Sequence, residues 1–346
     1  MKNLILTNEK KNIVYAAQVL KSGGLVAIPT ETVYGLAANA LDKEAVSHIF
    51  KAKGRPADNP LIVHIAKKED LEKYAYVNEK AWACAERFWP GPLTMILPKK
   101  ECIPDSVSAG LDTVAVRLPA NETARQIILE SGLPLAAPSA NISGRPSPTC
   151  AEHVYHDFGE SIDAIIDAGP CVCGVESTVI TLASDPPVLL RPGFVTPEQL
   201  KDILSDLQIS PAVLHELPQN AKVLSPGLKH KHYAPKAQTT CVIGSSENCA
   251  RYIHRQKTEC KTIVLCFDEE QNNYSDMVCY AYGKENDAQT MARNIFELLR
   301  RADEEHAERI FIHAQLQNGV GLAVYNRLLR ACGFDVVDAD QLIKEM

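Results

Sequence analysis

Apolar and polar positions along the first 207 residues alternate between a helical spacing and short strand-like runs. Residues 10–22 place apolar side chains at helical intervals, whereas residues 25–29 (LVAIP) form a short apolar run typical of a buried strand. Asp42 is a suitable N-cap for a second helix, which Gly54 should end. Because strand and helix patterns follow each other so closely, the sequence predicts an α/β domain with a mixed sheet.

The same pattern predicts several further elements before residue 208. Expected helices cover 122–131, with Asn121 as N-cap, and run from Thr196-Pro197 to about Leu207. Expected strands or strand ends lie at 61–65, 93–98, 113–119, 134–141, 164–169, 177–182 and 187–193.

The rest of the chain predicts a linker and a second domain. Residues 208–237 have no clear period and contain four prolines, but they are too apolar for a free tether, so we expect an ordered linker. The α/β pattern then restarts, which predicts a small parallel-sheet domain. The expected strands lie at 241–245, 262–267, 278–283 and 309–314, and the expected helices at 286–301 and 320–332. We therefore expect a domain at 1–207, a linker at 208–237 and a smaller α/β domain at 238–346.

Composition narrows the class of protein. The chain of 346 residues is 46% hydrophobic and carries a net charge of −7, which argues against a broad basic face for duplex nucleic acid. No apolar run reaches the roughly 18–20 residues needed to span a bilayer, and MKNLILTNEKKN is too short and polar for a signal peptide. Eleven scattered cysteines without a CxxC pair indicate free thiols in a reducing compartment. We expect a cytoplasmic protein without a membrane association.

One short stretch concentrates positive charge. KAKGRPADNPLIVHI (51–65) holds Lys51, Lys53 and Arg55 within five positions, before a predicted strand. The cations can simply complement the C-terminal end of a helix dipole. Alternatively, Pro56 and Pro60 stiffen the loop so that its cations form a cradle for polyphosphate, to which Arg is well suited. The pattern alone leaves both interpretations open.

Hydroxyl-rich stretches follow other predicted strands. TETVYG (30–35) and APSANISGRPSPT (137–149) place small hydroxyl side chains and one carboxylate where α/β proteins often bind ligands, although capped turns and surface loops have the same composition. Ser177, Thr178 and Arg191 repeat the theme. There is no GxxxxGK[ST], GxGxxG or GxSxG motif. These residues predict an enzyme that binds an anionic ligand, but they do not identify a reaction.

Six separated motifs occur in one order: TETVYGL, KAKGRPADNPL, PSAN (138–141), ESTV (176–179), RPG (191–193) and SPGLKHKHYAP (225–235). Together they resemble the threonylcarbamoyl-AMP synthase family in its two-domain form. The resemblance implies a YrdC-like N-terminal domain with a twisted mixed sheet and a concave open site, followed by a smaller Rossmann-like α/β domain. It also implies a nucleotidyltransferase that makes threonylcarbamoyl-AMP and pyrophosphate from L-threonine, bicarbonate and ATP. A separate transferase then modifies tRNA, so tRNA is acted on indirectly after a transient hand-over.

The resemblance also implies roles for particular residues. The family's signature falls on Lys53, Arg55, Ser139 and Asn141. Its ATP-binding positions fall on Arg55, Asn59, Thr113, Ser139, Ser147, Arg191 and Tyr233. Its threonine-binding positions fall on Thr32, His64, Arg117, Ser177 and the backbone of Ala137. Mg²⁺ is expected on the ATP phosphates, without metal ligands from protein side chains.

The implied chemistry explains the cationic stretch. A carbamate formed on threonine must attack the α-phosphate, so two anions meet, and we assign Lys53 and Arg55 to offset their repulsion. Arg117 suits the threonine carboxylate because a guanidinium pairs with it bidentately. Whether His64 acts as a base or only as a hydrogen-bond partner is open. We also expect the linker to cover the site, with Tyr233 reaching the nucleotide. This cover should exclude water and so slow hydrolysis of the reactive product.

Two rival functions are weighed against this one. A carbamoyltransferase of hydrogenase maturation uses a related domain, but its zinc-finger and acylphosphatase-like segments are absent from this sequence. A non-catalytic double-stranded RNA-binding module needs a positively charged face, which the acidic balance opposes.

Overall fold

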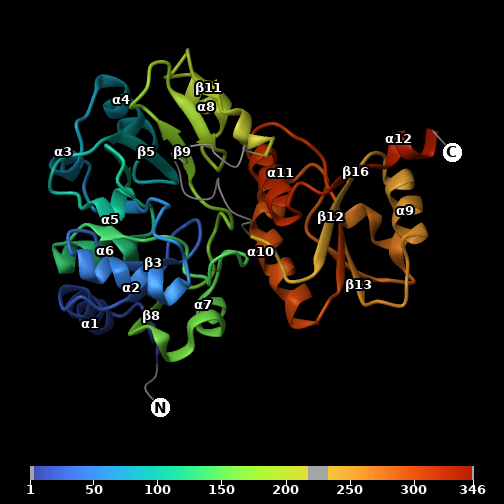
Figure 1. Ribbon diagram of the computed structural model, residues 1–346, viewed down its shortest axis with the longest axis horizontal. Coiled ribbons are helices and arrows are strands. Elements are labelled where there is room, and N and C mark those ends of the chain that lie inside the picture. The colour runs from blue at the N-terminus through green and yellow to red at the C-terminus, as the bar shows by residue number, and fades with distance from the viewer. Residues whose placement is uncertain (1–3, 217–232, 345–346) are drawn as a thin grey trace. The chain divides into compact units, whose positions relative to one another are not determined.

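The computed structural model describes residues 4–216 and 233–344 (Figure 1). These residues fall into two compact units. The first unit runs to Val213 but leaves out Gly144–Pro146. The second unit is made up of Gly144–Pro146, Leu214–Glu216 and the described residues from Tyr233 onward. Among the described helices, none combines the length and the apolar character that a membrane crossing requires.

The first unit combines short strands with helices that are mostly one to three turns long. Its strands are β1 (Ile5–Thr7), β2 (Val26–Ile28), β3 (Gly35–Asn39), β4 (Ile62–His64), β5 (Leu93–Pro98), β6 (Thr113–Arg117), β7 (Leu135–Ala136), β8 (Ala164–Asp167), β9 (Thr178–Thr181), β10 (Val188–Arg191) and β11 (Gln208–Ile209). Its helices are α1 (Lys10–Lys21), α2 (Lys43–Lys53), α3 (Leu71–Tyr74), α4 (Glu79–Phe88), α5 (Asp105–Ser108), α6 (Glu122–Ser131), α7 (Ala151–Phe158) and α8 (Pro197–Lys201).

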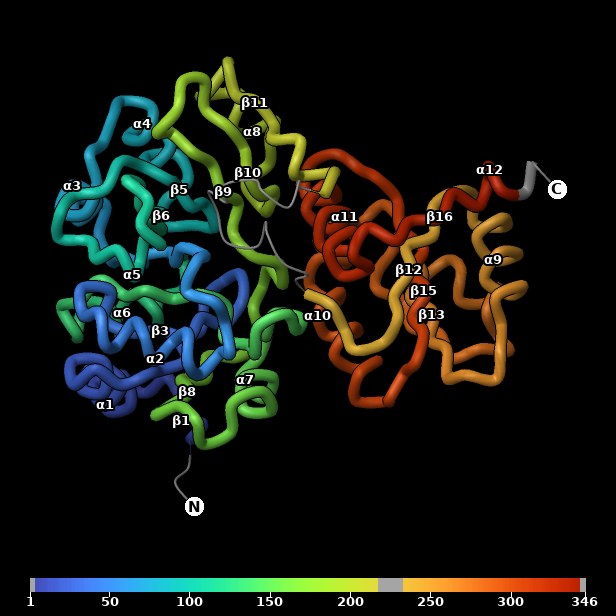
Figure 2. The backbone as a smooth tube through the Cα atoms, in the orientation of Figure 1, coloured from blue at the N-terminus to red at the C-terminus, as the bar shows by residue number. Residues whose placement is uncertain are grey.

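These strands form one eleven-stranded sheet, and it is mixed, as the sequence predicts. The order is β1-β8-β2-β3-β7-β4-β6-β5-β9-β10-β11. Neighbours β4 and β6 are parallel, β6 and β5 are antiparallel, and β5 and β9 are parallel again. Helices α1 and α6 pack against each other, and α1 and α2 both contact β3 (Figure 2). The centre of the sheet therefore places the carboxyl end of β6 beside the amino end of β5, where the candidate site lies.

Helix ends in this unit follow the predicted capping residues. The Asp42 side chain accepts hydrogen bonds from two backbone N–H groups of α2, and Gly54 ends that helix in the left-handed conformation, with φ of 58°. Asn121 caps α6 by accepting one such hydrogen bond, from Ala124 N. The helix expected from Thr196 to about Leu207 is shorter, because α8 ends at Lys201. The chain then adds β11 beside β10, so the first unit continues beyond residue 207.

The second unit contains a five-stranded, entirely parallel sheet, which confirms the predicted α/β domain. Its strands are β12 (Gln238–Ile243), β13 (Thr262–Cys266), β14 (Val278–Ala281), β15 (Arg309–His313) and β16 (Val336–Asp338), in the order β14-β13-β15-β12-β16. Its helices are α9 (Ser246–Arg255), α10 (Ala288–Glu304), α11 (Val320–Ala331) and α12 (Ala339–Lys344). Helices α10 and α11 cover one face of the sheet, and α9 and α12 the other (Figure 1). Strand β16 and helices α9 and α12 are not among the predicted elements.

Candidate active site

A row of polar side chains crosses adjacent strands at the centre of the first sheet. In the strand register, Arg117 at the end of β6 lies between His64 on β4 and Thr94 on β5. The Thr94 hydroxyl lies 2.8 Å from that of Ser177, the residue that precedes β9. Arg191, at the end of β10, donates to both the backbone oxygen and the hydroxyl of Ser177, at 3.0 and 3.1 Å. The sheet therefore brings the predicted residues His64, Arg117, Ser177 and Arg191 into one row.

Arg117 is buried and held by groups from two other segments. Its Nη1 donates to the Thr32 hydroxyl at 2.9 Å, and its Nη2 lies 2.7 Å from a carboxylate oxygen of Glu31. Thr32 is also close to Thr30, whose hydroxyl lies 2.8 Å away. Burial acts to raise the pKa of Glu31, but the charge and hydrogen bonding of Arg117 outweigh it, so the pKa lies below its usual value. The TETVYG stretch thus brings a carboxylate directly against the predicted carboxylate-binding arginine.

His64 is a neutral side chain in this environment. It is buried, and burial together with the positive charge of Arg117 lowers its pKa to about 3. Its Nδ1 lies 3.3 Å from the backbone oxygen of Ile62. The net charge beside Arg117 is therefore set by Glu31, and not by a protonated histidine. Both roles considered for His64, a base and a hydrogen-bond partner, stay open.

The three clustered cations have different environments. Lys51 is exposed on α2, whereas Lys53 is buried and donates to the backbone oxygens of Ser139 and Asn141, both at 2.6 Å. Arg55 is half-buried and donates to the backbone oxygens of Asn59 and Pro60, at 3.0 and 3.1 Å. The stretch is therefore tied both to its own loop and to the Pro-Ser-Ala-Asn stretch.

The Pro-Ser-Ala-Asn stretch is also paired with TETVYG. Gly35 forms a β-bridge with Ser139, and Leu36 N donates to the Pro138 oxygen at 2.8 Å. The backbone of Ala137 donates to the Ile62 oxygen at 3.0 Å. Main-chain pairing thus joins the loops that carry Thr32, Ser139 and Asn141, although they are about a hundred residues apart in the sequence.

Two further predicted positions lie in different surroundings. Ser147 is buried and its hydroxyl donates to the carboxylate of Glu176, which precedes Ser177. Thr113 begins β6, so about 13 Å of strand separates it from Arg117 at the other end. Strand geometry does not bring Thr113 into the row, and its assignment to ATP stays a prediction.

Some residues of the site were not predicted. Thr94, which links Arg117 and Ser177, was not singled out in the sequence analysis. The sequence did contain a signal for it, because a threonine inside a buried apolar strand is a polar residue in an apolar environment. Glu176 was likewise quoted only within a motif. His153 is buried and accepts a hydrogen bond from Thr149 N. Over residues 4–216 and 233–344, no group of three or more His, Cys, Asp or Glu side chains is arranged to hold a metal ion.

Only the end of the SPGLKHKHYAP motif can be located. Its residues 225–232, and most of the predicted linker, lie outside the described residues. Tyr233 itself is buried in the second unit, where its ring centroid lies 5.2 Å from that of Phe296 and 5.8 Å from the guanidinium carbon of Arg327. Its assignment to ATP, and the linker as a cover, stay predictions.

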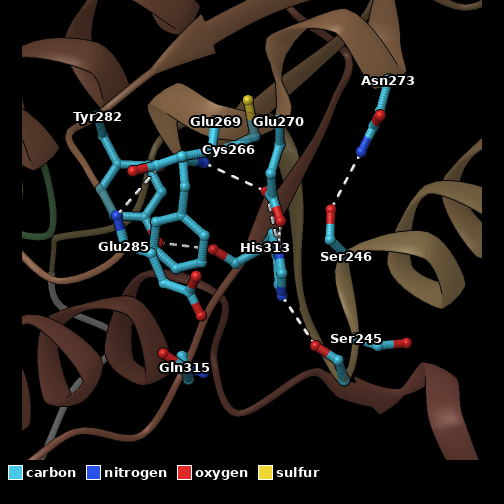
Figure 3. A network of polar contacts seen from close by, with 12 residues as sticks. Ser245, Ser246, Cys266, Glu269, Glu270, Asn273, Tyr282, Glu285, His313 and Gln315 are labelled. Atoms are coloured by element: carbon cyan, nitrogen blue, oxygen red, sulfur yellow. Dashed lines mark hydrogen bonds and ion pairs between the residues drawn. The ribbon is translucent and has the colours of Figure 1, made fainter.

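The second unit contains a separate buried polar cluster at the carboxyl ends of its strands (Figure 3). His313, the last residue of β15, donates from Nδ1 to Glu270 at 2.8 Å and from Nε2 to the Gly244 oxygen at 3.1 Å. Burial acts to lower the pKa of His313, but hydrogen bonding and charge from Cys249 and Glu270 raise it to about 10. Tyr282 donates to the His313 backbone oxygen at 2.7 Å. This charged pair ties the segments that follow β12 and β13 to the end of β15.

Comparison with known proteins extends the assignment over both units. A family model described as "Telomere recombination" matches residues 18–193, and one described as "Threonylcarbamoyl-AMP synthase, C-terminal domain" matches residues 195–333. A Pyrococcus abyssi protein named threonylcarbamoyl-AMP synthase is 46% identical, with 95% of this chain and 96% of that protein covered. A Bacillus subtilis protein of the same name is 44% identical, with 96% of both chains covered.

A solved structure gives the same result for the fold. The structure described as "Crystal structure of P. abyssi Sua5 complexed with L-threonine" is 44% identical, with a TM-score of 0.87. The match covers 97% of this chain and 99% of that one.

The fold and the site define a two-unit α/β enzyme of the nucleotidyltransferase type, with a buried charged site on its mixed sheet. The chain belongs to the threonylcarbamoyl-AMP synthase family. A non-catalytic double-stranded RNA-binding module is not favoured by this assignment.

Proposed function

We propose that the protein joins L-threonine, bicarbonate and ATP into threonylcarbamoyl-AMP, with release of pyrophosphate. The observation that carries the proposal is the row from His64 through Arg117 and Thr94 to Ser177 and Arg191, in a chain that matches this family over nearly its whole length. A row with an arginine at two separate points suits a reaction in which a carboxylate and a phosphate must both be held.

The amino-acid end of the site is proposed to lie around Arg117. L-threonine would be held by Thr32, His64, Arg117, Ser177 and the backbone of Ala137. A neutral His64 can accept a hydrogen bond from the substrate without adding positive charge beside Arg117. A buried threonine carboxylate would be stabilised strongly here, because charge-assisted hydrogen bonds strengthen where water is excluded.

The nucleotide end is proposed to lie along the cationic loop and Arg191. ATP would be held by Arg55, Asn59, Thr113, Ser139, Ser147, Arg191 and Tyr233. The family's signature would be completed by Lys53 and Asn141. Fixed cations would lower the repulsion between the carbamate and the α-phosphate. Mg²⁺ would be held by the ATP phosphates and would supply further positive charge there. In this proposal no protein side chain would bind the metal directly, and the protein's own residues would place the phosphates.

The predicted linker at 208–237 is proposed to cover the nucleotide, between a catalytic domain at 1–207, whose sheet is extended by β11, and an anchoring domain at 238–346. Tyr233→Ala should then weaken ATP binding more than threonine binding. The product is a reactive mixed anhydride, so we propose a transient hand-over to a tRNA threonylcarbamoyl transferase, in the cytoplasm and without a membrane. tRNA would be acted on only through that transferase.

The test is pyrophosphate release from ATP by the full chain. Release should require L-threonine and bicarbonate together, and serine should be the strongest competitor, because one methyl group changes binding by only about 1–3 kcal/mol. Alanine, which has no hydroxyl, is the matched control. Equal release with alanine, or release without bicarbonate, would contradict the proposed substrates.

A further inference from the structure

We propose that Glu31 binds the amino group of the amino-acid substrate, so that Glu31 and Arg117 together select a zwitterion over a simple carboxylate. The inference deepens the proposed function and rests on it. It concerns a residue outside the set that the family resemblance places on threonine.

The Glu31 carboxylate is buried directly against the guanidinium of Arg117. Its exposed fraction is 8%, and that of Arg117 is 4%. Their closest atoms, Arg117 Nη2 and a carboxylate oxygen of Glu31, are 2.7 Å apart and form an ion pair. A carboxylate can accept more hydrogen bonds than one guanidinium contact supplies, so Glu31 can also accept from an ammonium group that arrives with the substrate.

Arg117 itself is fixed by other contacts. Its Nε lies 3.4 Å from the Gly91 oxygen and its Nη1 donates to Thr32. Strand pairing with His64 and Thr94 holds its backbone on both sides. Glu31 is therefore not the only group that orients the guanidinium, and its carboxylate is available for a second partner.

Charge balance decides which ligand this pair accepts. The pKa of Glu31 lies below its usual value and that of His64 is about 3, so at neutral pH the pair of Glu31 and Arg117 has no net charge. A zwitterion places its carboxylate on Arg117 and its ammonium on Glu31. A carboxylate without an amino group would instead place a second negative charge beside Glu31 in a poorly screened environment.

The direct test compares two ligands that differ only in the amino group. Titration calorimetry of the full-length protein should give 3-hydroxybutanoate, which is threonine without its amino group, an affinity about 10- to 100-fold below that of L-threonine. Equal affinities in the wild-type protein would overturn the inference without any variant.

Glu31→Gln then separates recognition from a structural role. Threonine binding should weaken about 10- to 100-fold, while 3-hydroxybutanoate should bind as well as before or better, because the opposing charge is gone. A residue that only supports Arg117 would weaken both ligands together, and that result would overturn the inference. Glu270→Gln, a buried carboxylate of the second unit, is the matched control and should change neither affinity.

The two proposals fail in different ways. Pyrophosphate release by the wild-type protein that needs threonine and bicarbonate supports the proposed function, whatever Glu31 does. If that release is present but Glu31→Gln leaves the ratio of the two affinities unchanged, only the role of Glu31 is wrong. If the wild-type protein neither binds threonine nor responds to it, both are wrong.

Discussion

Lys53 places its ammonium nitrogen 2.6 Å from the backbone oxygen of Asn141, a residue 88 positions later in the chain. The same nitrogen contacts the Ser139 oxygen at 2.6 Å, and Ser143 N donates to the Lys53 backbone oxygen at 2.9 Å. A lysine at the end of α2 therefore positions the Pro-Ser-Ala-Asn stretch. Any positive charge that Lys53 offers a phosphate is held rigidly by these contacts.

Lys53→Met should reduce both activity and stability. Two buried carbonyls lose a charged donor, and each loss costs about 1–3 kcal/mol of the free energy of unfolding. Pyrophosphate release should fall by more than about tenfold. Lys51→Met is the matched control, because Lys51 is exposed on the same helix and should change neither quantity. Chemical denaturation and steady-state kinetics of the two variants measure both effects, and equal behaviour of the two would contradict this role.

Arg55→Ala should separate activity from stability. Arg55 is half-buried, and its guanidinium donates to the Asn59 and Pro60 oxygens of its own loop, so the fold should persist. Loss of a charge-assisted contact to the nucleotide should cost about 1.5–3 kcal/mol, which is roughly tenfold or more in kcat/KM for ATP. Arg55→Lys keeps the charge without the planar fork and should recover part of the activity. Wild-type kinetics in Arg55→Ala would argue against the phosphate cradle.

The local parts of this structure were predictable from the sequence, whereas its long-range polar contacts were not. Asp42, Gly54 and Asn121 act within a few residues of their own position, so capping chemistry located these helix ends. The contact from Lys53 to Asn141, and that from Thr94 to Ser177, depend on which strands become neighbours. Spacing along the chain contains no information on such pairing.

The predicted site shows the same limit. The motifs identified which loops carry the chemistry, but Glu31 was considered only as a carboxylate at a strand end. Its contact with Arg117 arises because the loop before β3 meets the end of β6 in the folded sheet. The sequence analysis placed the residues of β11 in the linker. This strand consists of one polar and one apolar residue, Gln208 and Ile209, and two residues are too few to form a recognisable strand pattern.

The Glu270–His313 pair should make the stability of the second unit depend on pH. The pKa of His313 is raised to about 10 from an ordinary value of 6.5, so its stabilisation is complete below pH 6.5 and is lost as the pH rises toward 10. The pKa of Glu270 is lowered from 4.5, because the opposing effect of burial is outweighed by His313, so its stabilisation is present above pH 4.5 and is lost on acidification.

The comparison is between the wild-type protein and a Glu270→Gln/His313→Gln double variant. Hydrogen exchange of the β12 and β15 amides reports the free energy of unfolding in this unit. The difference between the two proteins should be largest near pH 5–6.5 and should shrink toward pH 10. His306→Asn, at an exposed histidine of the same unit, is the control. A difference that is constant from pH 6 to 10 would show that His313 does not change its charge over this range.

Arg117→Leu should weaken threonine binding by at least tenfold while the affinity for ATP changes by less than about twofold. Arg117 is assigned to the threonine carboxylate, and a charge-assisted contact of this kind contributes about 1.5–3 kcal/mol.

The substitution also leaves Glu31 buried without its ion-pair partner, which should lower the free energy of unfolding by about 3–5 kcal/mol. A Glu31→Gln/Arg117→Leu double variant removes the stranded charge, so it should recover part of the stability but none of the threonine affinity. Calorimetric titration with each ligand and denaturation of the three proteins separate these effects. A loss confined to ATP would place Arg117 at the nucleotide end of the row, and recovery of threonine binding in the double variant would show that the guanidinium is needed only to neutralise Glu31.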